Sequence, residues 1–167
     1  MRSQDVLIDG YGRIREEVHA VVDGLSADDL HARPGDGGAN SIAWLVWHLT
    51  RVQDDHIADA AGIEQVWLAK GWADRFGLPL EKTDTGYGHT SQQVGQVRVA
   101  SGGLLLDYYD AVHEQTLGFL GRLDGNALNR VVDERWDPPV TLGVRLVSVL
   151  GDDLQHVGQA AYVRGLL

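Results

Sequence analysis

Cysteine is absent from this chain, and its absence excludes several kinds of chemistry. None of the 167 residues is a cysteine, so the chain cannot form a disulfide, a thiolate zinc cluster or a cysteine nucleophile. A metal ion would therefore have to bind through nitrogen and oxygen ligands. A reaction that needs a thiol would have to take that thiol from another molecule.

Positive charge and long apolar runs are also scarce. The chain has 14 Lys and Arg residues against 24 Asp and Glu residues, which gives a formal net charge of −10. Because such a field repels phosphate groups, we expect no nucleic-acid partner. No apolar run approaches the roughly 18 residues of a membrane span, and the first residues, MRSQDVLIDGYGRIREE, lack the apolar stretch of a secretory signal. We therefore expect a cytoplasmic protein with no membrane partner.

Four segments repeat apolar residues at intervals of three and four, which is the pattern of an amphipathic helix. These segments cover residues 7–25, 42–61, 104–120 and 142–164. Ser26 can cap a short turn after the first segment, Asn40 or Ser41 can cap the second, and Thr141 can cap the fourth. No segment alternates as a strand of useful length would, so we expect no sheet. The length fits a single domain over residues 1–167.

Residues 62–102 differ from the rest because they show no sustained apolar period. Aromatic residues stand there among glycines and polar residues, and a further helix can start at Ser91, just after Tyr87, His89 and Thr90. About forty residues of connection indicate either a crossover with short helices of its own or a lid over a functional site. Four helices with one long connection between the second and the third predict an all-α four-helix bundle.

Polar side chains flank the apolar stripes of the second and fourth predicted helices. At about 100° per residue, Asp152 and His156 lie about 40° apart on the flank of the fourth helix, and His48 lies on the flank of the second. A carboxylate and a histidine four residues apart, joined by a histidine from another helix, provide three ligands and leave a metal ion with open positions. That arrangement is typical of a catalytic metal site. The alternative is that these are ordinary hydrogen-bonded histidines beside solvated aspartates.

Two stretches carry a resemblance to a known family. The stretch NSIAWLVWHLTRVQDDH, followed far downstream by LVSVLGDDLQHVGQAAYVRG, resembles the DinB-like superfamily, in its branch of bacterial proteins related to mycothiol-dependent maleylpyruvate isomerase. The resemblance covers nearly the whole chain and implies a four-helix bundle, with a long crossover after the second helix, that binds a divalent metal through three side chains. His48, Asp152 and His156 match those ligands, although the members closest to the isomerase carry Glu and others His where this chain has Asp152. Asp153 and His56 are alternative ligands by a shift of one position, and we rank both below the matched set.

The resemblance also implies metal-activated thiol chemistry. A divalent ion, for which Zn²⁺ and Ni²⁺ are the leading candidates, would bind a thiol such as mycothiol and lower its pKa so that the proton is lost. The resulting thiolate would attack a small-molecule electrophile. The implied function is a metal-dependent S-transferase or isomerase. One alternative is a metal-dependent hydrolase, for which the candidate general bases are Asp55, His56, His89 and Asp153. Another is a non-catalytic metal-binding bundle that forms a homodimer.

Overall fold

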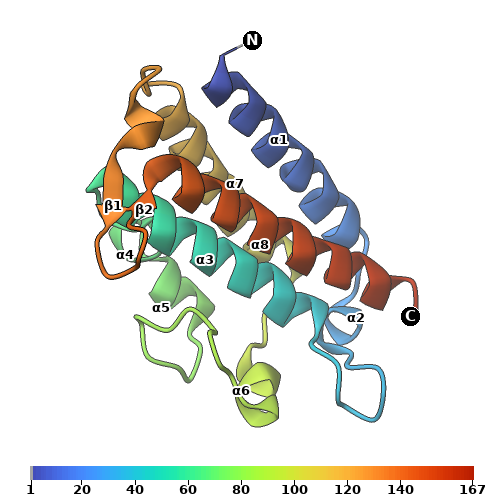
Figure 1. The fold of residues 1–167 in the computed structure, drawn as a ribbon. Coiled ribbons are helices and arrows are strands. Elements are labelled where there is room, and N and C mark those ends of the chain that lie inside the picture. Colours follow the sequence, from blue (N-terminus) through green and yellow to red (C-terminus); the bar gives the residue numbers. More distant parts are fainter. Residues whose placement is uncertain (1) are drawn as a thin grey trace.

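Four long helices form the body of the molecule (Figure 1). The structure is a computed structural model that describes residues 2–167. The long helices are α1 (Ser3–Val22), α3 (Ile42–Ala61), α7 (Gly102–Leu120) and α8 (Leu142–Arg164). The prediction of an all-α four-helix bundle is confirmed. The first helix begins earlier than the apolar pattern alone indicated and ends before Leu25.

The packing order of the helices decides which side chains meet. α3 packs against α8 and α7, and α1 packs against the same two helices, so α1 and α3 lie diagonally across the bundle (Figure 1). α3 and α8 run antiparallel: His48, near the start of α3, contacts His156 far along α8, and His56 contacts Arg145 near the start of α8. Facing positions of these two helices can therefore build a shared site.

Short polar side chains fix where the helices begin. The hydroxyl oxygens of Ser26, Ser41 and Thr141 accept hydrogen bonds from backbone N–H groups of the first turns of α2 (Ala27–His31), α3 and α8. Each bond satisfies a donor that has no partner inside the helix. The second predicted cap is thus Ser41 and not Asn40.

The long connection between α3 and α7 contains three short helices, as a crossover with helices of its own requires. These are α4 (Val66–Ala69), α5 (Trp72–Phe76) and α6 (Ser91–Gln96), and α6 begins at the predicted residue. In Figure 1 they lie on the α3 side of the bundle, away from α1. Buried Asp54 of α3 anchors the connection by accepting hydrogen bonds from the backbone N–H groups of Val66 at 2.8 Å and Trp67 at 2.7 Å. The Tyr108 hydroxyl of α7 donates to the same carboxylate at 2.9 Å.

The segment of the chain that connects α7 to α8 forms a small sheet, so the expectation of no strands was wrong for this segment. After the 3₁₀ turn η1 (Ala127–Asn129), β1 (Val131–Asp133) pairs antiparallel with β2 (Val140–Thr141). Strands of three and two residues are too short to show a period-two pattern in the sequence. Within the described part of the chain, no helix is long and apolar enough to cross a membrane.

Candidate metal centre

The structure brings the three matched residues together. His48 of α3 and Asp152 and His156 of α8 each place one potential ligand atom within 4.8 Å of the others. The His48 and His156 rings lie 4.8 Å apart between centroids, and His156 Nε2 is 3.6 Å from Asp152 Oδ1. The antiparallel pairing of α3 and α8 makes this cluster, because it sets the part of α8 that carries Asp152 and His156 against the first half of α3.

Both imidazoles of the cluster are held through the same ring nitrogen. His48 Nδ1 lies 2.5 Å from the carbonyl oxygen of Thr85, which can only accept, so Nδ1 carries the proton. His156 Nδ1 lies 3.1 Å from Oε1 of Gln159. In each ring this leaves Nε2 with its lone pair. Ring stacking of Trp44 on His48, at 4.6 Å between centroids, holds the plane of the His48 ring.

The donor set fits a divalent metal ion. Two imidazole nitrogens and one carboxylate oxygen suit Zn²⁺ or Ni²⁺. Burial lowers the pKa of His48 below its ordinary value, and the neighbouring His156 acts in the same direction, whereas the hydrogen bond that His48 donates to the Thr85 carbonyl raises it. The neutral imidazole that results is the form that binds metals. Asp152 Oδ2 is buried without a hydrogen-bond partner among the described residues. This oxygen is therefore available to bind a metal ion.

The neighbouring Asp153 has a different environment. Its side chain is 0% exposed inside the bundle, while the side chain of Asp152 is 40% exposed. Neither carboxylate oxygen of Asp153 has a hydrogen-bond partner within residues 2–167. Burial, reinforced by the charge of Asp152, raises the pKa of Asp153 well above its ordinary value. Burial raises the pKa of the Tyr11 and Tyr109 hydroxyls, and the nearness of Asp153 adds to both shifts. Asp153 therefore lies among buried groups of the bundle interior and not at the cluster.

A cavity of about 550 Å³ lies between α3, α8, the β1–β2 hairpin and the loop after α5. His48 and Asp152 border it at one end, and valine side chains of α3, α8 and the hairpin form much of its wall. Two exposed aromatic side chains also line it, Tyr87 of the loop and Trp136 of the hairpin. A small molecule in this cavity would therefore have direct access to an ion held by the cluster.

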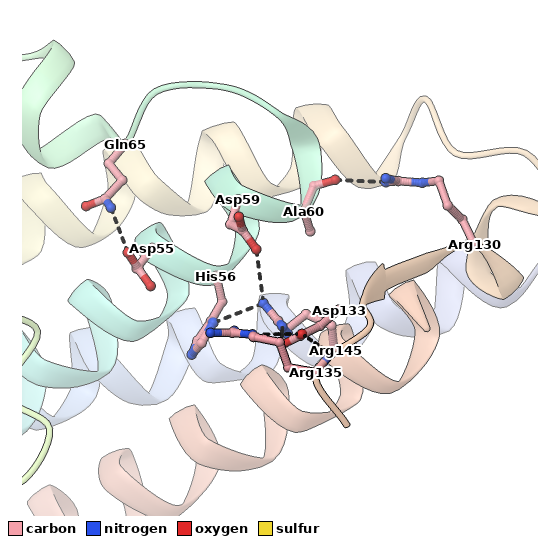
Figure 2. A network of polar contacts seen from close by, with 9 residues as sticks. All are labelled: Asp55, His56, Asp59, Ala60, Gln65, Arg130, Asp133, Arg135 and Arg145. Carbon is pink, nitrogen blue, oxygen red and sulfur yellow. Dashed lines mark hydrogen bonds and ion pairs between the residues drawn. The ribbon is translucent and has the colours of Figure 1, made fainter. Parts of the chain in front are cut away.

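A polar network built around Arg145 lines another part of the cavity, and Figure 2 shows its contacts. Its guanidinium donates to His56 Nδ1 at 3.2 Å and lies 3.4 Å from the carboxylates of Asp59 and Asp133. Arg135 binds both oxygens of Asp133. These contacts join the hairpin to α3 and α8. His56 is eight residues, or roughly 12 Å, along α3 from His48, so it is not a ligand of the same ion.

The other candidate bases are engaged in hydrogen bonds or buried. His89 Nδ1 accepts from the Trp44 indole at 3.0 Å, and its Nε2 lies 3.0 Å from the Asp84 carboxylate. Asp55 lines the cavity but accepts a hydrogen bond from Gln65 at 2.7 Å (Figure 2). Sequence reasoning missed Asp84. Its carboxylate binds His89 only because the loop folds back onto α3.

The fold and this donor set together define a DinB-like helical bundle with a candidate metal site. A model of the family described as mycothiol-S-transferase matches residues 11–167, and the chain belongs to that family. Among solved structures, it is similar to one described as the crystal structure of a conserved protein from Enterococcus faecalis. The two share 31% sequence identity over 99% of this chain and 97% of that one, with a TM-score of 0.93. A comparison with curated proteins finds no match.

Proposed function

We propose that His48, Asp152 and His156 bind one divalent metal ion and that the chain is an S-transferase for a low-molecular-weight thiol. The observation that carries the proposal is the position of two of these residues, His48 and Asp152, at the end of a cavity large enough for a small molecule. When bound, a divalent ion supplies a positive charge that lowers the pKa of a coordinated thiol. Mycothiol is the thiol that the family suggests, and Zn²⁺ or Ni²⁺ suits the donor set.

The chain's own residues contribute ligand orientation and a cavity beside the cluster. The Nδ1–H groups of His48 and His156 donate hydrogen bonds to Thr85 and Gln159, which leaves Nε2 of each ring available to a metal ion. Valine side chains make part of the cavity wall apolar. We place this reaction in the cytoplasm, where low-molecular-weight thiols are kept reduced. An isomerase would use the same steps and then release the thiol again.

The hydrolase alternative has less support from the site. Hydrolysis at a metal is assisted by a general base within reach of the attacking water. Three of the candidate bases already accept a hydrogen bond: His56 from Arg145, His89 from Trp44 and Asp55 from Gln65. The fourth, Asp153, is buried in the bundle interior. A coordinated thiol loses its proton more readily than coordinated water and so depends less on such a base.

The test is to incubate metal-loaded protein with a panel of electrophiles, with and without mycothiol, bacillithiol or glutathione, and to follow free thiol. We expect thiol consumption that requires both the protein and an intact His48, with His48→Ala as the control variant. Thiol-independent turnover of an ester or amide that is lost in His48→Ala would support the hydrolase. Stoichiometric metal with no turnover of any electrophile would support the non-catalytic bundle.

A further inference from the structure

A second buried imidazole lies close to the cluster, and its hydrogen bonds fix its tautomer. The side chain of His89 is 3% exposed and stacks on Trp47 at 5.9 Å between ring centroids. The indole N–H of Trp44 can only donate, so His89 Nδ1 must be the acceptor. In neutral His89 the proton is therefore on Nε2, which donates to the carboxylate of Asp84. Both ring nitrogens of His89 are used, which makes it a structural link and not a base.

Asp84 passes this link to the backbone of the loop. Its carboxylate also accepts a hydrogen bond from the backbone N–H of Gly86 at 2.8 Å, and its carbonyl oxygen accepts one from Arg51 Nε at 3.2 Å. The peptide between these two anchored points carries the Thr85 carbonyl, which faces His48 Nδ1. The direction of that carbonyl is thus set by bonds on both sides of it.

The close approach of this loop to His48 requires glycine at position 86. Gly86 has φ +91, a conformation that residues with a side chain rarely adopt. A Cβ at this position would lie 2.7 Å from His48 Nδ1 and 3.0 Å from the Trp47 ring. Gly88, two residues on, also has a positive φ of +72, but a Cβ there would meet no described atom within 4 Å. The two glycines share the backbone requirement, and only Gly86 touches the imidazole.

We infer that the loop Asp84–His89 positions His48 and that His89 is a positioning residue acting through Asp84 and Thr85. By holding the Thr85 carbonyl against Nδ1, the loop keeps His48 in the Nδ1–H tautomer and leaves Nε2 for a metal ion. The inference rests on the proposed function only in taking His48 as a ligand. The tautomer itself is a property of the metal-free chain and can be observed without an ion.

The experiment compares four variants with the wild-type chain. His89→Leu removes both bonds of His89, and His89→Gln keeps an amide oxygen for Trp44 and an amide N–H for Asp84. Gly86→Ala pushes the loop away from His48, and Gly88→Ala is the matched control for backbone strain. Circular dichroism and thermal unfolding verify the fold of each variant. If His89→Leu does not fold, the pair of glycine variants still decides the outcome.

Two readouts are taken at pH 8, above the ordinary pKa of a histidine side chain. Two-bond ¹H–¹⁵N correlation spectra of the metal-free proteins give the tautomer of His48, assigned among the 7 histidines by comparison with His48→Ala. Zn²⁺ affinity is measured by competition with a chromophoric chelator. We expect wild type, His89→Gln and Gly88→Ala to show the Nδ1–H tautomer. We expect His89→Leu and Gly86→Ala to populate the Nε2–H tautomer and to bind Zn²⁺ about 10–100-fold more weakly, as loss of an outer-shell partner does.

The outcomes separate this inference from the proposed function. An unchanged His48 tautomer and unchanged Zn²⁺ affinity in both His89→Leu and Gly86→Ala would overturn the positioning role. Equal effects of Gly86→Ala and Gly88→Ala would also overturn it, because backbone strain alone would then explain the loss. A tautomer change in His89→Leu and Gly86→Ala, found together with a wild-type chain that binds no Zn²⁺, would refute the metal site and leave the positioning of His48 by the loop intact.

Discussion

Two adjacent aspartates of α8 test the ligand assignment with a matched pair of substitutions. Asp152→Asn and Asp153→Asn each replace one carboxylate by an amide of nearly the same size. Successive side chains on a helix differ by about 100° in direction, so the two residues face different surroundings. Asp152 Oδ1 lies 3.6 Å from His156 Nε2 beside the cavity, whereas Asp153 is 0% exposed in the bundle interior. We expect Asp152→Asn to weaken metal binding and Asp153→Asn to leave it unchanged.

The size of the effect follows from the place of each residue. Loss of a partner that only orients a ligand costs about 10–100-fold in metal affinity. Asp152 would be a ligand itself and the only negative one among the three, so its loss should cost more than about 100-fold, or roughly 2.8 kcal/mol. Asp153→Asn removes no ligand, and its affinity should stay within about threefold of wild type. Asp152→Glu should retain most of the affinity, because its longer carboxylate can still reach the two imidazoles.

The assay is Zn²⁺ titration of the metal-free proteins against a chromophoric chelator, with elemental analysis of each protein after desalting as an independent count of bound metal. Unfolding curves of the metal-free variants show whether a loss of affinity reflects a loss of fold. Equal losses for the two aspartates, or a larger loss for Asp153→Asn, would refute the assignment of Asp152 and favour a ligand shifted by one position.

Three further predictions concern stability and access. Asp54→Ala should lower the free energy of unfolding by about 3–5 kcal/mol in urea titrations, because it leaves buried Arg51 without its ion pair; a loss below about 1 kcal/mol would contradict this anchoring role. Burial lowers the pKa of His113 below its unfolded value of about 6.5. The free energy of unfolding that depends on neutral His113 is therefore fully present above pH 6.5 and is lost as the pH falls through the folded pKa. His113→Gln should therefore flatten the fall in unfolding free energy between pH 7 and pH 5, and an unchanged slope would be evidence against it. Ser148→Trp should fill the cavity beside the cluster and reduce thiol consumption at least about tenfold while keeping stoichiometric metal; full activity would mean that substrates do not use this cavity.

The sequence was enough to predict the long helices and the cluster between them. Helical spacing alone places Asp152 and His156 one turn apart on one flank, and His48 on the flank of another helix. Their meeting depends on α3 and α8 being antiparallel neighbours. The family resemblance implied only that the second and fourth helices share a metal site, and the packing shows how they meet. Single residues such as Ser41 and Thr141 set the helix starts through local hydrogen bonds, so local sequence also indicated them correctly.

Contacts made by the connecting segments could not be predicted in the same way. The β1–β2 hairpin consists of strands too short to alternate, and it reaches α8 through the pairing of Asp133 with Arg145. The support of His48 by Thr85 joins residues that are 37 positions apart, through a loop that has no period. Its glycines indicate turns, but which turn faces His48 depends on the packing of the whole crossover. For this reason His89 was a candidate base in the sequence and is a buried link in the structure.

The most direct test of the account is the absorption spectrum of the cobalt(II)-substituted protein as mycothiol is added. Cobalt(II) takes the same nitrogen and oxygen ligands as zinc, and a thiolate bound to it gives a charge-transfer band that free thiol and protein do not. We expect stoichiometric cobalt in the wild-type chain, with a thiolate-to-cobalt band that appears on titration and saturates at one thiol per metal. We expect neither in His48→Ala. A wild-type chain that holds cobalt but gives no such band, or a His48→Ala chain that gives the same band, would contradict the claim that His48, Asp152 and His156 hold a thiol-activating metal.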